Sequence, residues 1–259
     1  MNMEFLEYNL FNTTTMASVT NGTSTVSYLI DRDSSTQFAT SGDNSDLTTT
    51  TIRIDLLSAV NISRIILENI NFKSFKIYYN SNTANTFTLT NNLTSTSSWV
   101  SNSETSLYLI FATTSVSLIT INVTSTMAAN EEKKCGNLWI CNKYHTLTNN
   151  PSAKNYKPIF DNKQYNHEMS DGGLSVYKIA NSFQATINLD FVSLADRIKL
   201  KGIFDMVMPF VFVPEPTGTA WSGDIYEVNW VDDFGFYQFS DNYKGNGYSG
   251  SLKIRETPK

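Results

Sequence analysis

Histidine and cysteine are scarce in this chain of 259 residues, which contains two histidines and two cysteines. Neither histidine accompanies a Gly-x-Ser-x-Gly elbow or a cysteine in a pattern typical of nucleophilic catalysis. A P-loop phosphate-binding motif is also missing, and the Gly-rich segment 244–250 leads into a strand candidate instead of a helix. We therefore expect no enzyme, no catalytic residue and no cofactor, with calcium as the one ion to consider.

Paired carboxylates are the one catalytic pattern that the composition leaves open. Acids on neighbouring strands can face each other across a cleft, as in enzymes that cleave polysaccharides. The candidates here are Asp190, Asp224, Glu227, Asp232 and Asp233. Solvated strand ends explain the same residues more simply, so a polysaccharide-cleaving enzyme is a minor alternative.

The two cysteines, Cys135 and Cys141, lie six positions apart. On one straight strand they would stand roughly 20 Å apart, too far for a disulfide. We expect free thiols in a reducing compartment. A zinc site would have to add His145 and His167, but the C-x5-C spacing is not that of a zinc knuckle.

Charge is low and slightly acidic: charged residues make up 17% of the chain, and the formal net charge is −5. Such a chain repels phosphate backbones, and no stretch interleaves basic residues with aromatics. The sequence has no apolar run of about eighteen residues and no typical signal peptide. We expect no nucleic-acid partner, no membrane span and no export signal.

The pattern of apolar residues predicts a mainly β protein. Before residue 130 the chain is rich in Ser, Thr and Asn, and segments such as "TIRIDL" and "LITINV" alternate apolar with polar residues, as half-buried strands do. This composition changes near "TMAANEEKK". We predict two domains, 1–130 and 131–259, the first of them a β-sandwich.

The second domain is predicted to be a β-rich sandwich carrying one helix. The helix should cover about 193–208, with Ser193 as N-cap, Asp196 in the first turn and Pro209 beyond its end. "LSVYKIA" and "SFQATINLDFV" should pair across an Asn-Ser turn, and 149–171 reads as a long polar loop. Four more strand candidates follow the helix: "PFVFVPEP", "DIYEVNWV", "FGFYQFS" and "YSGSLKIRE".

An aromatic cluster between 221 and 240 offers a candidate subunit interface. Alternation along two strands sends one set of side chains into a core and leaves another on a face where aromatics often make contacts between chains. A purely structural core accounts for the cluster equally well, and a sugar-stacking platform is a smaller alternative. The interface candidates are Trp221, Tyr226, Trp230, Phe234 and Phe236.

One loop and the strand after it carry a family resemblance. "YLIDRDSSTQFAT", followed by "TTTTIRIDLLSAVNISRIIL", resembles the discoidin or coagulation-factor type C family, whose fold is a galactose-binding-like jelly roll. Arg32 stands where that family has glycine, and Phe38 where it has tryptophan. The matching positions are Asp31, Asp33, Thr36, Ile52, Ile54, Asp55, Leu56, Val60 and Ile65.

The resemblance implies two roles for the acidic loop. Asp and Thr side chains can bond to nearby backbone N–H groups and fix a turn, while Phe38 plugs one end of the sandwich. In some family members the equivalent loop helps hold calcium, a cation that prefers oxygen ligands. Here Asp31 and Asp33 are the calcium candidates, with Glu131 or Glu132 as further ligands.

A discoidin-like sandwich followed by this second half is similar in layout to structural tail proteins of tailed bacteriophages. The resemblance implies a tail or baseplate component, present in the virion after assembly in the host cytoplasm. Residues 131–259 would form rings with copies of the chain and contact other tail proteins, while the first domain is displayed. The alternative is a carbohydrate-binding adhesion module for cell-surface glycans, with Trp99 and Phe38 as its aromatic candidates.

Overall fold

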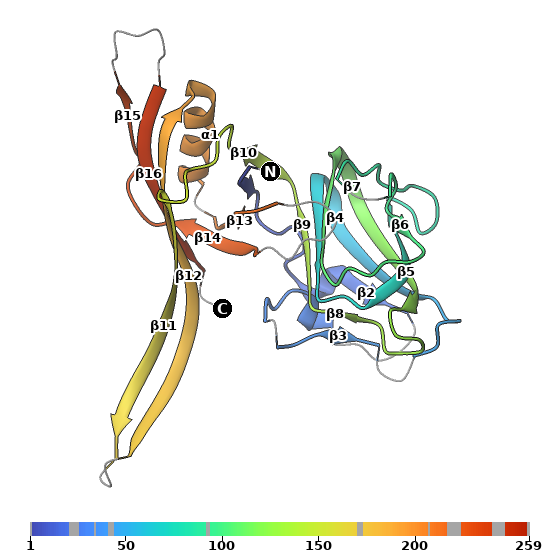
Figure 1. Ribbon diagram of the computed structural model, residues 1–259. Helices are drawn as coiled ribbons and strands as arrows, with labels where there is room; N and C mark the ends of the chain where they lie inside the picture. The colour runs from blue at the N-terminus through green and yellow to red at the C-terminus, as the bar shows by residue number, and fades with distance from the viewer. Residues whose placement is uncertain are drawn as a thin grey trace.

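The computed structural model describes residues 2–20, 26–33, 35–40, 44–91, 94–169, 173–206, 208–216, 224–239 and 247–257. The fold is mainly β with antiparallel strand pairing, which confirms the predicted class. Figure 1 shows two lobes side by side, from one of which a long hairpin extends. Among the described residues, no helix has the length and apolar character needed to span a membrane.

The first lobe is built on a six-stranded sheet with the order β2-β4-β7-β5-β6, in which β9 also pairs with β4. A two-stranded sheet, β3-β8, contributes Phe38 and Cys135 to the same hydrophobic core. The strands are β2 (Ala17–Val19), β3 (Phe38–Ala39), β4 (Thr50–Glu68), β5 (Phe72–Tyr79), β6 (Ser98–Trp99), β7 (Leu107–Thr126), β8 (Lys134–Cys135) and β9 (Asn137–Cys141). Two short 3-10 helices, η1 (Thr14–Met16) and η2 (Val26–Leu29), complete the lobe.

The second lobe is an eight-stranded sheet with the order β10-β1-β13-β14-β16-β12-β11, in which β15 also pairs with β16. Its strands are β1 (Glu4–Leu6), β10 (Lys143–Thr146), β11 (Tyr156–Glu168), β12 (Leu174–Val192), β13 (Phe210–Val213), β14 (Tyr226–Trp230), β15 (Gly235–Phe239) and β16 (Gly247–Glu256). The four strand candidates after the helix are therefore confirmed as β13 to β16.

Strand pairing crosses the predicted domain boundary in both directions. β1, from the N-terminus, lies between β10 and β13 of the second lobe, and β9, from beyond residue 130, pairs with β4 of the first. The division into 1–130 and 131–259 stays a prediction. A third hydrophobic cluster fills the seam between the lobes and includes Leu6, Ile66, Trp139 and Val211.

Several predicted strands are longer than the alternation indicated. "TIRIDL" belongs to a longer strand, β4, which continues through Glu68; the exposed segment after Leu56 is accommodated by a register shift with Leu57 at φ 64°. Residues 62–67 of β4 are all buried because one face meets the first core and the other meets the seam cluster. Burial on both faces removes the alternation that marks a half-exposed strand.

The prediction for 149–192 was wrong in its pairing. Tyr156–Glu168, expected in a loop, forms β11, and the expected Asn-Ser turn lies inside the continuous strand β12. β11 and β12 instead pair with each other in antiparallel orientation. The sequence of β11 is largely polar because much of this strand lies outside the packed body of the lobe (Figure 1), so alternation could not identify it.

Helix α1 (Leu194–Phe204) confirms the predicted helix, although it ends earlier than 208. Ser193 is its N-cap, and the Ser193 hydroxyl accepts a hydrogen bond from the Asp196 N–H at 3.0 Å. Not every apolar side chain of the helix faces the core: Ile203 is buried, but Leu194 and Ile198 are more than half exposed. The helix also buries Asp196 and Leu200. The Asp196 carboxylate is hydrogen-bonded to the Thr148 hydroxyl of the second lobe.

Candidate functional site

The acidic loop that carried the family resemblance is a network of short-range hydrogen bonds. The Asp31 carboxylate accepts bonds from the Asp33 N–H (2.9 Å) and the Thr36 hydroxyl (2.6 Å). The Asp33 carboxylate accepts bonds from the N–H and the hydroxyl of Ser35. The described residues contain no group of three His, Cys, Asp or Glu side chains arranged to hold a metal ion. Calcium at Asp31 and Asp33 therefore stays a prediction.

Arg32 uses the position where the resembling family has glycine. Its φ is 59°, which lies in the left-handed region that favours glycine. Its guanidinium forms two hydrogen bonds with the Glu227 carboxylate of β14, one of them 2.8 Å long. It also lies 5.4 Å from the Trp139 ring centroid. The loop of the first lobe is thus fixed to the second lobe.

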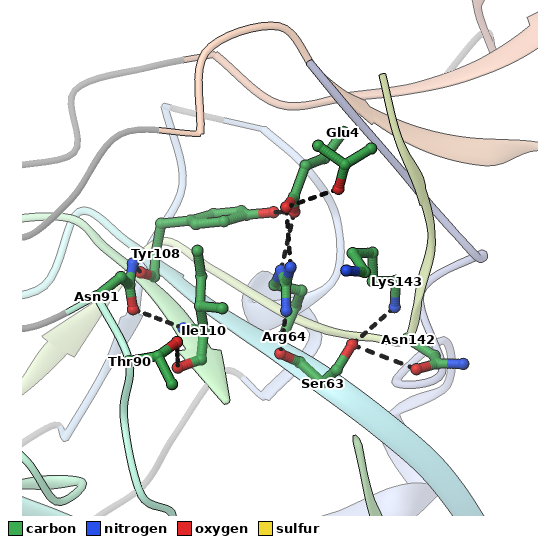
Figure 2. A network of polar contacts seen from close by, with 10 residues as sticks. Glu4, Ser63, Arg64, Thr90, Asn91, Tyr108, Ile110, Asn142 and Lys143 are labelled. Atoms are coloured by element: carbon green, nitrogen blue, oxygen red, sulfur yellow. Dashed lines mark hydrogen bonds and ion pairs between the residues drawn. The ribbon is translucent and has the colours of Figure 1, made fainter. Parts of the chain in front are cut away.

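A second, deeper contact joins the lobes through a buried carboxylate (Figure 2). Glu4 of β1 accepts hydrogen bonds from Arg64 Nε at 2.9 Å and Nη2 at 2.8 Å. The hydroxyls of Tyr108 (2.6 Å) and Thr146 (3.2 Å) donate to the same carboxylate. Burial alone would raise the pKa of Glu4, but these hydrogen bonds and the charge of Arg64 outweigh burial and hold the pKa below its usual value.

Beside the contact between Arg32 and Glu227 lies a cavity of about 280 Å³, here called the seam pocket. It is lined by residues of both lobes: Arg32, Glu68, Asn137, Trp139, Phe160, Asp224, Ile225, Tyr226, Glu227 and Glu256. Trp139 Nε1 donates to the Glu68 carboxylate at 2.8 Å, and the hydroxyl of Tyr226 is hydrogen-bonded to Asp224. Burial, and then the Asp224 carboxylate, raises the pKa of Tyr226. The pocket is therefore acidic and partly aromatic.

A second hollow, here called the sheet groove, lies over β2, β4 and β7 of the first lobe and has a volume of about 350 Å³. It is lined by Ser18, Thr20, Thr51, Arg53, Asn82, Thr83 and Asn122. The Thr51 hydroxyl donates to Asn122 Oδ1 at 2.9 Å, and Asn122 Nδ2 donates to the Asn82 carbonyl at 3.1 Å. Within the described part of the chain, Arg53 has no ion-pair partner. The sheet groove thus presents hydroxyls, amides and one unpaired guanidinium.

The aromatic candidates of the second domain pack largely within the chain. Tyr226 and Phe236 are buried, and Tyr226 stacks on Phe183 with ring centroids 3.6 Å apart. Trp230 and Phe234 pack against each other and against Phe204 of α1. Trp221 lies outside the described residues. Their role as a subunit interface stays a prediction, and the described rings contribute to the second core.

The aromatic candidates for glycan contact are both buried. Phe38 is fully buried, as expected for a plug, and Trp99 is 5% exposed and stacks on Phe75 at 4.4 Å. Neither can offer an exposed ring face to a sugar. The prediction of Trp99 as an exposed stacking residue is wrong because β6 pairs with β5 and places this ring in the first core.

The remaining chemical candidates are dispersed. Cys135 and Cys141 are free and buried on different strands, and burial raises the pKa of both thiols. His145 Nε2 lies 2.9 Å from Asp196 Oδ1, and no described residues gather into a metal site around it. Of the carboxylates considered for glycoside cleavage, the structure brings Asp224 and Glu227 into the seam pocket, where Glu227 is already paired with Arg32.

Sequence reasoning missed the seam pocket and the sheet groove. The sheet groove gathers Ser, Thr and Asn residues that composition alone could not distinguish from any other Ser/Thr-rich strand surface. The seam pocket had one usable signal, because an arginine at a position that favours glycine needs a compensating contact. The partner of that arginine, Glu227, is 195 positions away in the sequence and could not be found from spacing.

No family model matches the sequence, and no curated protein matches it. Among solved structures, chitosan-binding module 1 of a chitosanase/glucanase from Paenibacillus sp. IK-5 is 17% identical, with a TM-score of 0.39, over 51% of this chain and 98% of the module. The family 32 carbohydrate-binding module of C. perfringens NanJ, in complex with galactose, is 16% identical, with a TM-score of 0.38, over 54% of this chain and 98% of that chain.

A fucosidase from Ruminococcus gnavus, in complex with fucose, is also similar, at 16% identity and a TM-score of 0.38. The match covers 52% of this chain and 26% of the fucosidase. At these identities and TM-scores, no functional residue is transferred from these proteins to this chain.

Proposed function

We propose that the protein binds carbohydrate through the sheet groove of its first lobe. The observation that carries the proposal is the chemistry of that groove, in which every lining side chain ends in a hydroxyl, an amide or a guanidinium. These groups can both donate and accept hydrogen bonds, except for the guanidinium, which donates only. Sugar hydroxyls need both kinds of partner.

Arg53 gives the sheet groove its selectivity. It is exposed on β4 and has no ion-pair partner among the described residues, so its charge is available to a ligand. A guanidinium binds a carboxylate through two parallel hydrogen bonds. The preferred ligand is therefore a glycan with acidic sugars, of the kind displayed on cell surfaces.

The test is a glycan array probed with the full chain and with Arg53→Ala. Lys76→Ala is the matched control, because Lys76 is an exposed basic residue paired with Asn122 on the same sheet and lies outside the groove lining. We expect binding to acidic glycans that Arg53→Ala abolishes and Lys76→Ala retains. Equal binding by wild type and Arg53→Ala, or no glycan bound by wild type, would contradict the proposal.

A second candidate function, assembly into a tail or baseplate structure, is favoured by the hairpin that leaves the second lobe. β12 pairs with β16 only from Gln184 onward, so the preceding part of β12 has β11 as its described strand partner. We call this two-stranded segment, residues 161–169 and 173–182, the arm (Figure 1). A two-stranded ribbon alone is marginally stable in water. The arm is therefore suited to packing against another copy of the chain.

Oligomeric state tests the second candidate. Light scattering and negative-stain images of the full chain should show closed rings, and replacement of residues 162–181 by Asn-Gly should leave a monomer. The join is short enough because Asp161 and Ser182 are strand partners, and Asn-Gly makes a two-residue hairpin turn. A wild-type chain that stays monomeric, alone or with neighbouring tail proteins, would exclude ring assembly.

A further inference from the structure

Among the described residues, carboxylates outnumber cations in the lining of the seam pocket. Four carboxylates line it, from Glu68, Asp224, Glu227 and Glu256, against one described cation, Arg32. Arg32 is committed to Glu227 through two hydrogen bonds. Asp224 and Glu256 therefore remain without a described cation beside a cavity of about 280 Å³. A cationic ligand would be attracted to this arrangement, and an anionic ligand would be repelled.

Two buried polar atoms in the lining lack hydrogen-bond partners within the described chain. Asn137 is 6% exposed, and its Oδ1 accepts no hydrogen bond. Arg32 Nε also has none. Buried polar groups are seldom left unpaired, so each unpaired group calls for a partner such as a ligand or a water. The acceptor on Asn137 would suit an N–H or O–H donor on the same ligand that meets the carboxylates.

An exposed aromatic ring completes the lining. Phe160, at the base of the arm on β11, is 56% exposed and lies 6.4 Å from Tyr226, centroid to centroid. Tyr226 has one ring face covered by Phe183. An ammonium group is attracted to the face of an aromatic ring, and the attraction increases when water is excluded. Phe160 thus offers a ring face to a cation held by the carboxylates.

The cation expected here is organic. Carboxylates that bind Ca²⁺ or Mg²⁺ must converge on one point, and the described residues contain no such convergent group of three. An ammonium group makes three separate hydrogen bonds in different directions, which suits acceptors spread around a cavity. We propose that the seam pocket binds a primary ammonium group carried on a body about the size of a monosaccharide.

The proposal is independent of the sheet groove and is tested by calorimetric titration of the full chain. D-glucosamine and D-glucose are the first pair of probes, because they differ at one position by an amine in place of a hydroxyl. Nα-acetyl-L-lysine amide and Nα-acetyl-L-norleucine amide are the second pair, which differ by the side-chain ammonium group alone and distinguish an amino sugar from an amino-acid side chain. We expect saturable binding of one or both amines at low salt, and none of the neutral partners.

Variants assign the binding to the pocket. Asp224→Asn removes one exposed carboxylate, and we expect it to weaken amine binding about tenfold, as loss of one charge-assisted hydrogen bond does. Asp233→Asn makes the same charge change at an exposed position outside the pocket and should leave binding unchanged, as should Arg53→Ala. Matching melting temperatures would show that the variants fold.

Three results would overturn the proposal. The first is equal binding of glucosamine and glucose together with equal binding of the blocked lysine and norleucine amides. The second is binding of neither amine. The third is a loss of affinity in Asp233→Asn as large as that in Asp224→Asn. If the glycan array succeeds while these titrations fail, the seam pocket is excluded and the sheet groove is not. If the titrations succeed while the glycan array fails, the sheet groove is excluded and the seam pocket is not.

Discussion

Replacing Arg64 with methionine isolates the contribution of the buried contact between the lobes. The Arg64 and Glu4 side chains are each 4% exposed, and Arg64 supplies two of the four hydrogen bonds that the Glu4 carboxylate accepts. Methionine keeps much of the arginine stem but removes the charge and both of these donors. Glu4 would then keep the hydroxyls of Tyr108 and Thr146 and have no positive charge beside it.

The expected loss is large because a buried charge is left without its partner. Breaking a buried ion pair from one side costs about 3–5 kcal/mol. A native protein is stable by only about 5–15 kcal/mol in total, so this is a substantial fraction. For a chain of this length the corresponding fall in melting temperature is roughly 6–20 °C. Urea unfolding at pH 7, followed by tryptophan fluorescence, measures the loss in free energy directly.

The pH dependence gives a second readout with opposite signs in the two proteins. In wild type the pKa of Glu4 is lowered, so its contribution is present above the usual value of 4.5 and is lost as pH falls through the lowered pKa. In Arg64→Met, burial without the arginine raises the pKa of Glu4. The free energy of unfolding of the variant then falls as pH rises above 4.5. Its difference from wild type should therefore be smaller at pH 5 than at pH 7.

A double variant controls for the loss of packing. Glu4→Gln/Arg64→Met removes the buried charge but keeps an amide oxygen for the hydroxyl of Tyr108, so it should recover about 1–3 kcal/mol relative to Arg64→Met. A deficit below about 1 kcal/mol in Arg64→Met at pH 7 would refute the reasoning. A deficit that does not change between pH 5 and pH 7 would refute the assigned role of charge.

Three further predictions follow from local geometry. Arg32→Lys should lower the melting temperature because a lysine cannot form two parallel hydrogen bonds with Glu227. Arg32→Gly, which suits the φ of 59°, should not restore the melting temperature of wild type. Equal melting temperatures for wild type and both variants would contradict this. Gly250→Ala should cost about 1–3 kcal/mol, since its Cβ would lie 2.5 Å from the Gly235 carbonyl oxygen, whereas Ser249→Ala should cost less. Cys135 and Cys141, buried with raised pKa values, should react with a thiol reagent only after unfolding, and rapid labelling of the native protein would contradict their burial.

Local patterns predicted the features that depend on local chemistry. The strands β13 to β16 and the N-cap at Ser193 follow from alternation and from a hydroxyl before an apolar run. The acidic loop also forms the turn expected of Asp31 and Asp33, because each carboxylate bonds within five residues of itself. Short-range hydrogen bonds of this kind are determined by neighbouring residues and can be read from them.

Features that depend on distant contacts could not be predicted. β11 carries polar residues and Pro158, and it is a strand because β12 pairs with it over its whole length. In α1, apolar residues are exposed whereas the charged residue Asp196 is buried by its contact with Thr148. The spacing of apolar residues therefore does not identify the buried face of this helix. Both candidate sites are built from residues brought together by the packing of strands that are far apart in the chain.

The position of β1 has a consequence for the order in which the protein folds. Glu4–Leu6 precedes the first lobe in the chain, yet its neighbours in the sheet are Lys143–Thr146 and Phe210–Val213. The first lobe can be synthesised in full before either neighbour exists, because chains grow from the N-terminus and large proteins fold in parts. The N-terminal strand therefore cannot complete its pairing until Phe210–Val213 has been synthesised, although the partners of the Glu4 carboxylate, Arg64, Tyr108 and Thr146, come earlier in the chain.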